Sequence, residues 1–517
     1  MEVSTVFSRA PAGLDAPLVR VEVHLGSGLP TFALVGLPEA VVRESRDRVR
    51  AALVTAGHNF PQRRITVNLS PADLPKEGGR FDLPIAVGIL AADRRIRCDR
   101  LEQCEFYGEL SLGGALRETR KLLPALIAGA RAGREIILPA ANALEASLVS
   151  GGKLRMMDHL DQVVEALGGR AAPRTDMPAL RGISLPSQRE SRLSNQGEPS
   201  VRVKPIPDLC DVRGQYAAKR ALEIAAAGDH GMLMIGPPGA GKTLLAQRLP
   251  GLLPPLNDHE ILEVACLESA AGRRPSGGRR RPFRSPQHTA SVAALIGGGA
   301  MRPGELSLAH LGVLFLDEFP EFPRNALEAL REPMESGTVI LARLKRSCEF
   351  PARFQLIAAM NPCPCGYAGE VRGRCHCTAE QIARYRGRIS GPLIDRIDIH
   401  IELAALPVEH LMGSAPEAEH SAAVAERVAA ARELQLRRQG KLNARLAPPE
   451  VARVCAVAKE PRMLLSTAIL RLGLSARAYH RVLKVARTCA DLAGAADIRT
   501  VDVAEAVKLR ALDRPTG

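Results

Sequence analysis

A glycine-rich segment that ends in lysine and threonine is the part of the chain best suited to chemistry. It reads GPPGAGKT and comprises Gly236, Pro237, Pro238, Gly239, Ala240, Gly241, Lys242 and Thr243. An apolar run precedes it and leucines at helical spacing follow it, so we expect a strand, a phosphate-binding loop and a helix in that order. The glycines let backbone N–H groups converge on phosphate oxygens, while Lys242 would contact the β- and γ-phosphates and Thr243 would bind Mg²⁺. The segment therefore predicts a site for a nucleoside triphosphate.

A second short motif, Asp317 and Glu318, stands at the end of the apolar run Val313 to Leu316. The run predicts a buried strand, which would bring the two carboxylates close to the phosphate loop. Asp317 could then hold Mg²⁺ through water, and Glu318 could polarise the water that attacks the γ-phosphate. An acidic pair after an apolar run is common, but beside a phosphate loop it favours an ATPase that uses ATP and Mg²⁺.

Length and composition limit the class of protein. A chain of 517 residues is too long for one hydrophobic core and predicts two or three domains. The net charge of +14 permits a polyanionic partner, although a dispersed basic surface would give the same value. Eleven cysteines do not indicate disulfides in a chain that can build its own core. No apolar stretch approaches the length of a membrane span and the N-terminus lacks a signal pattern, so we expect a soluble, cytoplasmic protein without a membrane partner.

Residues 1–168 alternate short apolar runs with helical patterns, which predicts an α/β domain. Strands are expected at Val19 to Leu25, Thr31 to Val35 and Arg64 to Leu69, and helices at Val41 to Ala56, Ile85 to Ala92 and Leu122 to Ala132. The segments PKEGGRFD at 75–82 and GELSLGG at 108–114 resemble the proteolytic domain of Lon protease and its relative in bacterial RadA. In that resemblance Arg80 stands at the place of the nucleophilic serine and Leu123 at the place of its lysine partner. A Lon-like fold without peptidase chemistry is expected, because neither side chain can perform those roles.

The rest of the chain divides by composition and pattern. Residues 169–204 are rich in Pro, Ser and Arg, which predicts a linker. From Asp208 the order of helix, nucleotide strand, phosphate loop and acidic strand resembles an AAA+ core, expected over 205–402, in which the turn at 212–214 would lie near the adenine. The helical patterns of 403–517 predict a C-terminal lid.

The resemblance extends over nearly the whole chain. It is carried by RPFRSPQHTAS at 281–291, LIGGG at 295–299, PGELSLAHLGVLFLDEFPEF at 303–322, AAMNPCPCG at 358–366 and SGPLIDRIDIH at 390–400. The chain is similar to the ComM/YifB family of magnesium-chelatase-like AAA+ ATPases. The expected fold is therefore α/β: an AAA+ P-loop NTPase core with a helical lid, preceded by an α/β Lon-protease-like domain.

Two basic segments could contact nucleic acid. The first, which contains Arg279, Arg280, Arg281 and Arg284, is rich in glycine and proline and predicts a mobile loop. The second is a predicted hairpin, Thr338 to Ala342 and Glu349 to Phe354, whose turn carries Arg343, Lys345 and Arg346. In a ring-forming motor both segments would face the pore and bind DNA phosphates. A solvated charge run and a simple surface turn are the alternatives.

Asn361 follows the predicted strand Leu356 to Met360, where an amide could hold the attacking water or the γ-phosphate, the sensor 1 role. Just beyond it, two close pairs of cysteines are separated by nine residues: Cys363 and Cys365, then Cys375 and Cys377. Four thiolates suit a structural Zn²⁺, with His376 as a spare ligand, although C-x-C spacing is tighter than that of most zinc ribbons. Free thiols or a disulfide formed on oxidation are the alternatives.

By the same resemblance, Arg396 in SGPLIDRID is an arginine finger that reaches the γ-phosphate of the adjacent subunit, and Arg477 at a helix start is the sensor 2 arginine. An ion pair of Arg396 with Asp395 or Asp398 is the alternative reading. A finger that acts between subunits implies a homo-oligomer, which we expect to be a hexameric ring.

The resemblance implies an ATP-dependent DNA motor, with helicase or branch-migration activity on single-stranded or branched DNA, acting in homologous recombination during natural transformation. The alternative is a chelatase-type AAA+ motor that remodels a protein partner. A third possibility, an ATP-dependent protease, is disfavoured by Arg80 and Leu123.

Overall fold

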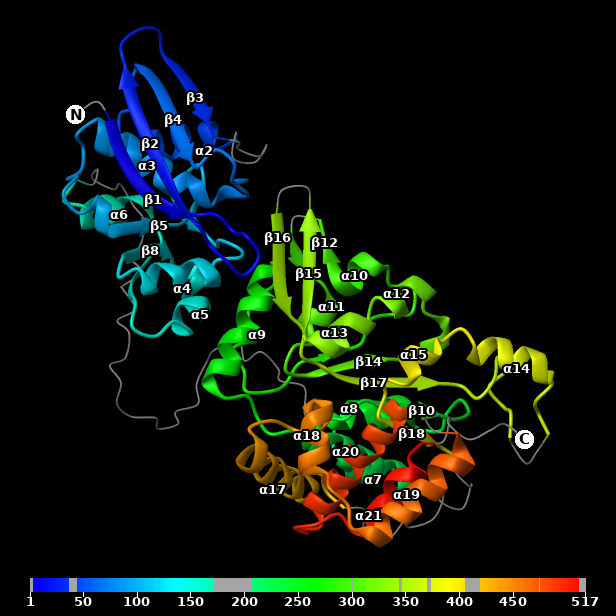
Figure 1. Ribbon diagram of the computed structural model, residues 1–517. Helices are drawn as coiled ribbons and strands as arrows, with labels where there is room; N and C mark the ends of the chain where they lie inside the picture. The colour runs from blue at the N-terminus through cyan, green and yellow to red at the C-terminus, as the bar shows by residue number, and fades with distance from the viewer. Residues whose placement is uncertain are drawn as a thin grey trace. The chain divides into compact units, whose positions relative to one another are not determined.

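The computed structural model describes residues 3–36, 44–170, 207–299, 301–343, 346–369, 373–404, 419–473 and 475–510. They form two compact units, Met1–Pro205 and Ile206–Gly517, each with its own sheet and core (Figure 1). The predicted linker lies outside the described residues from position 171 onward. Among the described residues, no helix is both long and apolar enough to cross a membrane.

The first unit is built on a seven-stranded mixed sheet in the order β3-β4-β2-β1-β5-β8-β9. The strands are β1 (Val3–Arg9), β2 (Leu18–Gly26), β3 (Thr31–Val35), β4 (Arg64–Ser70), β5 (Cys104–Phe106), β8 (Glu135–Pro139) and β9 (Lys153–Met157). Only β2 runs antiparallel to its two neighbours, β1 and β4. Helix α3 (Asp82–Ala92) is buried along its whole length and packs on β1 and β2, so it forms the centre of this core.

The described residues of the first unit also form the helices α2 (Ser45–Thr55), α4 (Leu123–Arg131), α5 (Ala143–Ser147) and α6 (Leu160–Ala166). The α/β class expected for residues 1–168 is therefore present. Residues along β2 and β4 are alternately buried and more exposed, because one face of each strand packs in the core and the other faces outward. This alternation is the pattern from which the sequence predicted both strands.

The second unit contains a five-stranded sheet in the order β11-β14-β17-β10-β18, and every neighbouring pair is parallel. The strands are β11 (Phe283–Arg284), β14 (Val313–Leu316), β17 (Gln355–Met360), β10 (Met232–Ile235) and β18 (Ile399–Glu402). Strand β10 is the first of these five strands along the chain, yet it lies between β17 and β18, which are the last two. The strand order therefore reverses beside β10. Ligands of parallel α/β sheets bind at the carboxyl ends of strands at such a reversal.

Both faces of this sheet are covered, because alternate residues of each strand enter different cores. Met232, Met234 and Phe315 pack with α7 (Tyr216–Gly228), α8 (Lys242–Leu252) and the lid helices. Leu233 and Leu316 pack instead with α10 (Val292–Ile296), α11 (Glu305–Leu308) and α12 (Arg324–Glu328). Figure 1 shows this layering, with the lid below the sheet and α10 to α13 above it.

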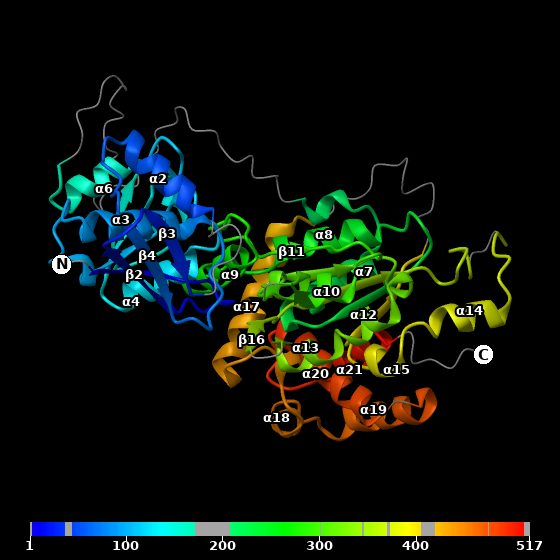
Figure 2. The same ribbon diagram turned by 90° about the horizontal axis from the view of Figure 1, so that it is seen from above.

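The lid consists of α17 (Ser421–Gln439), α18 (Pro448–Val454), α19 (Lys459–Leu472), α20 (Ala476–Leu492) and α21 (Thr500–Lys508). Helices α17 and α20 pack against α7 of the core, and their apolar residues belong to the same cluster. In contrast, α14 (Ala379–Arg386) stands away from the sheet in both views (Figures 1 and 2).

The sequence from Leu327 to Met334 has the pattern of one helix, but the structure divides it into two. Helix α12 ends at Glu328 and α13 (Arg331–Ser336) begins three residues later. The cause is Pro333, whose nitrogen carries no hydrogen and cannot donate to the carbonyl of Ala329 as a continuous helix would require.

We predict that replacing His400 with leucine removes part of the acid sensitivity of the fold. His400 is fully buried in β18, and burial, followed by the nearby Arg510 charge, lowers its pKa to about 3. Between that value and the unfolded pKa of about 6.5, only the unfolded chain binds the proton, so native His400 costs stability as the pH falls.

At pH 5 this proton binding lowers the free energy of unfolding by about 2 kcal/mol, and leucine at position 400 should remove that loss. Denaturant unfolding of wild type and His400→Leu, compared at neutral pH and at pH 5, measures the difference. An unchanged dependence of stability on pH in the variant would contradict the assignment.

Candidate active site

The phosphate loop joins β10 to α8 as the sequence predicts. Gly239 and Gly241 have φ values of 78° and 89°, which residues with a side chain rarely adopt. Lys242 opens α8, and its Nζ donates to the carbonyl oxygens of Gly236 at 2.6 Å and Pro237 at 3.0 Å. Burial lowers the pKa of Lys242, with Asp317 and Glu318 opposing that shift. The ammonium is thus held inside the loop, where it can neutralise phosphate charge.

Thr243 and Asp317 come together although 74 residues separate them. The Thr243 hydroxyl donates to Asp317 Oδ2 at 2.7 Å, and Asp317 Oδ1 accepts from the backbone N–H of Glu318 at 2.9 Å. Hydroxyl and carboxylate oxygens at the carboxyl end of a strand are ligands that suit Mg²⁺. The residues present therefore fit a Mg²⁺ held with the triphosphate.

Glu318 has a left-handed backbone, with φ of 51°, which is uncommon for a residue other than glycine. This conformation follows the end of β14 and turns the chain into the short 3-10 helix Phe319–Glu321. The Glu318 carboxylate is about half exposed and lies 3.0 Å from His288 Nδ1. Nothing in the sequence pairs His288 with Glu318, because the contact joins a loop to a strand end that are distant in the chain.

Asn361 completes the polar edge. It follows β17, the strand between β14 and β10, and its Oδ1 accepts from Lys242 Nζ at 3.1 Å. Three adjacent parallel strands thus end in the phosphate loop, the acidic pair and Asn361, which meet at one edge of the sheet.

Gln215 is a site residue that the sequence did not reveal. It has a left-handed backbone, with φ of 51°, just before α7. Its Nε2 donates to the carbonyl oxygen of Ala240 in the phosphate loop at 3.1 Å and to that of Ala404 after β18 at 2.8 Å. Gln215 therefore ties the turn at 212–214 to the phosphate loop.

The two arginines predicted to act on ATP lie at the opposite edge of the same sheet. Arg396 precedes β18, and together with Arg477 of α20 it lines a cavity of about 450 Å³ whose wall includes Gly231, just before β10. Four residues of β10 span about 13 Å, which separates this cavity from the chain's own phosphate loop. Within one chain, Arg396 and Arg477 therefore lie at the other end of β10 from Lys242 and Glu318.

Arg396 is nearly buried, with a side chain that is 10% exposed. Its Nη2 lies 2.6 Å from Glu335 Oε1 and its Nη1 donates to the Pro392 carbonyl at 2.7 Å, while its buried Nε has no partner among the described residues. The alternative reading, a pair with Asp395 or Asp398, is therefore not what the structure contains; the partner is Glu335. Arg477 is exposed and has no hydrogen bond or ion pair within the described residues.

The four cysteines converge after Asn361. The Sγ atom of Cys363 lies 3.3 Å from that of Cys365 and 3.7 Å from that of Cys375, and all four Sγ atoms, including that of Cys377, are within 4.8 Å of one another. A tetrahedral Zn²⁺ with bonds of about 2.3 Å requires sulfur atoms about 3.8 Å apart. The thiols thus fit one zinc ion with four protein ligands.

The cysteine loop also touches the phosphate loop. Gly366 has φ of 89°, and a Cβ placed on it would lie 2.8 Å from Pro238 Cδ. The close approach leaves no room for a side chain at position 366 and brings the cysteine loop against the nucleotide site.

Arginines of the first basic segment make hydrogen bonds and ion pairs within the chain that the sequence did not indicate. Arg284 makes two bonds to Glu305, at 2.6 and 2.8 Å, and Arg281 donates to the carbonyl oxygens of Pro254 and Leu311. These guanidinium groups hold the loop against α9 (Asp258–Ala270) and α11, so Arg281 and Arg284 have partners within the chain, and their contact with DNA stays a prediction. Arg279 makes an exposed ion pair with Asp258, and Arg280 also has an interaction partner.

The predicted hairpin is present as β15 (Thr338–Arg343) and β16 (Arg346–Pro351), with Arg343 opposite Arg346. Lys345 lies outside the described residues. A second, shorter hairpin, formed by β12 (Gly297–Gly298) and β13 (Arg302–Pro303), lies beside the first. The two hairpins are close enough that a Cβ placed on Gly297 would be 3.1 Å from Leu341 Cδ1 of β15. Figure 1 shows β12 next to β15. Arg302 in the shorter hairpin is exposed and was not singled out from the sequence.

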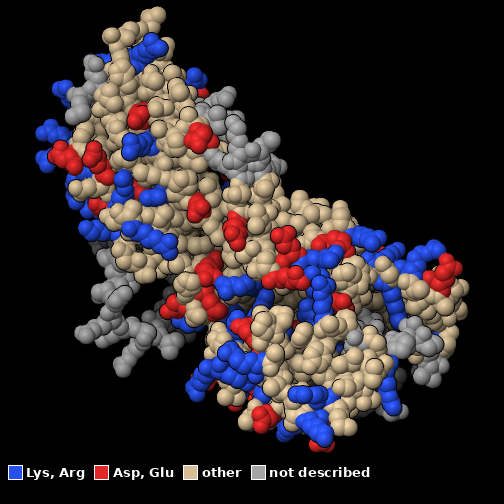
Figure 3. Space-filling model, viewed as in Figure 1, with Lys and Arg blue, Asp and Glu red and all other residues tan. Residues whose placement is uncertain are grey.

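On the face drawn in Figure 3, the described basic side chains do not form one continuous patch. Lys and Arg on this face are interspersed with Asp and Glu over both units. The net charge of +14 is thus partly dispersed, and local elements such as the hairpins have to carry any preference for a polyanion.

In the first unit, Arg80 is a structural residue. It is buried, and its guanidinium donates to the carbonyl oxygens of Arg120 at 2.6 Å and Lys121 at 3.1 Å. Burial lowers its pKa to about 10, so it stays charged at neutral pH. Leu123 is fully buried in the apolar core of that unit. Neither position offers a nucleophile or a base.

Comparison with known proteins agrees with this geometry. Family models match in three segments: magnesium chelatase, subunit ChlI, over 208–411; subunit ChlI of Mg-chelatase over 21–142; and magnesium chelatase, subunit ChlI C-terminal, over 418–510. Competence protein ComM of Haemophilus influenzae is 48% identical over 517 residues, covering 99% of this chain and 98% of that protein. The chain belongs to the ComM/YifB family. Its α/β fold is that of a magnesium-chelatase-like AAA+ protein.

Other relatives mark the range of the ComM/YifB family and its neighbours. The uncharacterized protein YifB of Escherichia coli is 46% identical over 517 residues, covering 99% of this chain and 98% of that protein. A more distant relative is DNA replication licensing factor MCM3 of Oryza sativa, 25% identical over 337 residues, which are 64% of this chain and 38% of that protein. AAA+ proteins of this kind are ATPases, in keeping with the phosphate loop and the acidic pair.

Proposed function

We propose that the protein is an ATP-driven DNA motor that assembles as a hexameric ring, as its family resemblance implies. The observation that carries the proposal is the division of the catalytic groups between two edges of one sheet. Lys242, Thr243, Asp317, Glu318 and Asn361 gather at the carboxyl edge, while Arg396 and Arg477 lie at the amino edge.

This division accounts for assembly. A γ-phosphate needs positive charge in the transition state, and arginine is well suited to supply it. Arg396 and Arg477 are too far from their own phosphate loop, so they would act on the ATP of an adjacent copy. Head-to-tail contacts of this kind generate closed rings when the rotation closes.

Within each site, the residues have separate roles. Thr243 and, through water, Asp317 would hold Mg²⁺, which would supply positive charge to neutralise the phosphates. Lys242 binds the β- and γ-phosphates, Glu318 polarises the attacking water, and Asn361 holds that water or the γ-phosphate. Gln215 keeps the phosphate loop in register with the turn before α7.

DNA is the partner we propose, in branch migration or helicase action during recombination in natural transformation. Support comes from the name of the ComM relative, a competence protein, and from the distant likeness to a DNA replication licensing factor. The paired hairpins at 297–303 and 338–351 carry arginines that could contact phosphates. The chelatase family models keep one alternative open, a motor that remodels a protein partner.

The test is DNA stimulation of ATP hydrolysis. We predict that forked or single-stranded DNA accelerates phosphate release by the wild type, and that Arg343→Glu/Arg346→Glu loses this stimulation while keeping the basal rate. Phosphate contacts weaken as salt rises, so the stimulation should decline with salt.

A matched control is Arg384→Glu/Arg437→Glu, two exposed arginines in ion pairs on α14 and α17. This control should retain stimulation. If wild-type protein binds no DNA even at low salt, the DNA proposal is wrong and the chelatase-type alternative is favoured.

We also propose that Cys363, Cys365, Cys375 and Cys377 hold a structural Zn²⁺. The support is the sulfur geometry and the presence of four protein ligands, which leaves no open position for catalysis. Such a metal would clip the loop that lies against Pro238.

Elemental analysis of the purified chain should give one zinc per chain, and Cys375→Ser/Cys377→Ser should reduce it to background. The control Cys98→Ser changes an exposed cysteine outside the cluster and should keep the metal. Zinc retained by the double variant, or absent from the wild type, would refute the assignment.

A further inference from the structure

A buried carboxylate, Asp398, stands beside the cavity that contains Arg396 and Arg477. It is 3% exposed and follows Arg396 by two residues, just before β18. One of its oxygens pairs with Arg481 of α20, and the other lies 2.8 Å from His230 Nδ1. Asp398 therefore joins three parts of the unit: the Arg396 segment, the lid helix that begins beside Arg477, and His230, two residues before the nucleotide strand.

The backbone around Asp398 is fixed as well. The N–H groups of Asp398 and Ile399 both donate to the Gly231 carbonyl, at 3.1 and 3.0 Å, and the buried Arg510 donates to the Ile397 carbonyl at 2.7 Å. Gly231 immediately precedes β10, whose other end carries the phosphate loop. The segment of Arg396 is thus anchored to the strand that holds the chain's own ATP site.

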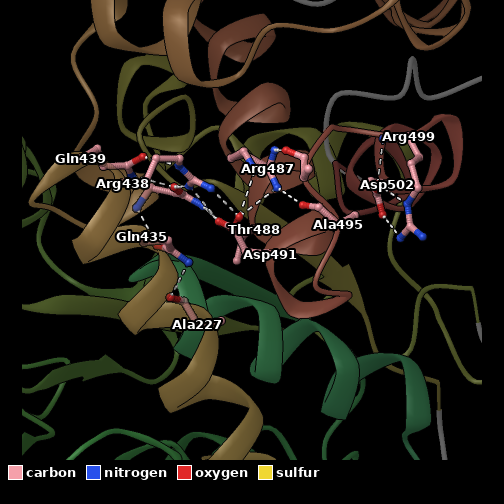
Figure 4. A network of polar contacts seen from close by, with 12 residues as sticks. Ala227, Gln435, Arg438, Gln439, Arg487, Thr488, Asp491, Ala495, Arg499 and Asp502 are labelled. Carbon is pink, nitrogen blue, oxygen red and sulfur yellow. Dashed lines mark hydrogen bonds and ion pairs between the residues drawn. The ribbon is translucent and has the colours of Figure 1, made fainter.

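On the lid side, the contacts continue through His230. Its Nε2 lies 2.8 Å from Thr488 Oγ1, and Asn443 Nδ2 donates to the same hydroxyl at 3.0 Å and to Asp491 Oδ2 at 2.8 Å. Arg438 and Arg487 complete the surroundings of Asp491. Figure 4 shows Thr488, Asp491 and both arginines in one connected network.

The charges around the cavity explain why a carboxylate is needed at this point. Its wall carries five cationic side chains, Arg396, Arg445, Arg477, Arg481 and Lys484, and three carboxylates, Asp229, Glu335 and Asp398. Asp229 pairs with Arg445 and Glu335 with Arg396. Asp398 is the third, and only it is held on two sides by buried or partly buried partners.

Asp398 is ionised at all ordinary pH values. Burial by itself would raise its pKa, but the Arg481 charge and the His230 hydrogen bond together bring the pKa well below its usual range. A permanent negative charge here holds Arg481, one helical turn from Arg477 on α20, at a fixed distance from the Arg396 segment.

We propose that Asp398 is a positioning residue for hydrolysis in the adjacent subunit: through Arg481 and His230 it sets the spacing between Arg396 and Arg477, so that both reach the same γ-phosphate of a second copy of the chain. This inference rests on the proposed function, because it assumes that the two arginines act between subunits. Asp398 itself touches no phosphate.

The test is complementation between two variants. Asp398→Asn subunits keep an intact ATP site but position their arginines poorly, whereas Glu318→Gln subunits keep the arginines but cannot activate water. A misplacement of about 1 Å can cost about 10²-fold, so each variant alone should hydrolyse ATP at least about tenfold more slowly than wild type. Mixed in equal amounts before nucleotide is added, they should recover about a quarter of the wild-type rate, since random mixing pairs a working site with working arginines at about one interface in four.

Two controls separate the possible causes. Arg396→Ala mixed with Glu318→Gln should recover in the same way, and Asp502→Asn, which alters another buried lid carboxylate paired with Arg499, should hydrolyse ATP alone at nearly the wild-type rate. Recovery with Arg396→Ala but none with Asp398→Asn overturns the role of Asp398 and leaves the proposed function standing. If ATP hydrolysis recovers in neither mixture, the arginines do not act between subunits, and both that part of the proposed function and this inference are overturned.

Folding is checked by circular dichroism and by binding of a fluorescent ATP analogue, which should match wild type. If Asp398→Asn does not fold, Arg481→Lys carries the test, because it keeps the charge and changes only its position. Arg481→Lys should also be slow alone and should recover on mixing with Glu318→Gln. Wild-type activity of Arg481→Lys alone would overturn the proposal.

Discussion

Replacing Glu318 with glutamine is expected to abolish ATP hydrolysis while leaving ATP binding intact. The carboxylate stands at the carboxyl edge beside the phosphate loop, next to Asp317, and is about half exposed, so it can accept a proton from an attacking water. Glutamine keeps the size and the contact with His288 but cannot act as a base. Loss of a general base typically lowers the rate about 10²- to 10⁴-fold.

Phosphate release under saturating ATP measures the rate, and titration with a fluorescent ATP analogue measures binding. Glu321→Gln is the matched control, because Glu321 is an exposed carboxylate three residues away that pairs with Arg388. It should behave as wild type. Hydrolysis by Glu318→Gln within a factor of a few of wild type would remove Glu318 from the chemistry.

The nucleotide site could be predicted from sequence because its parts are local patterns. An apolar run followed by glycines and Lys242 needs no tertiary information to indicate strand, loop and helix, and the same is true of β14 and Asp317. Asn361 was found because it too follows an apolar run. Each of these motifs follows the carboxyl end of a strand, and a parallel sheet places the carboxyl ends of its strands at one edge.

The parts that sequence could not supply are contacts between segments far apart in the chain. Gln215 bonds Ala404 across 189 residues, and His288 meets Glu318 through the fold alone. Arg284 looked available for DNA because its partner, Glu305, belongs to another element. Charge in a sequence gives no sign of pairing, so the sequence did not reveal the partners of this basic segment and gave no reason to single out Arg302.

The position of Arg396 supports the proposal that the ATP site depends on a second copy of the chain. Within one chain its guanidinium is held by Glu335 and the Pro392 carbonyl at the amino edge of the sheet, whereas the phosphate loop is at the carboxyl edge. A group so placed can complete a site only across an interface. The neighbouring Arg477, which has no partner within the described residues, makes the same edge electropositive.

Replacing Arg396 with alanine is therefore expected to lower ATP hydrolysis about 10³- to 10⁵-fold, the range seen when an arginine finger is removed. ATP binding should persist, because the phosphate loop and Lys242 are untouched. Arg396→Lys should remain strongly impaired, since an ammonium is a point charge and cannot present two donors to the phosphate as a guanidinium does.

Phosphate release measures the rate, and sedimentation in the presence of nucleotide shows whether the variant still assembles. Arg388→Ala is the control, because this exposed arginine lies nearby in the chain and pairs only at the surface with Glu321. If Arg396→Ala assembles and hydrolyses ATP as wild type does, the arginine has a structural role with Glu335. If instead wild-type protein hydrolyses ATP equally fast as a dilute monomer, no group from a second copy is needed, because the rate of a shared site must rise with protein concentration.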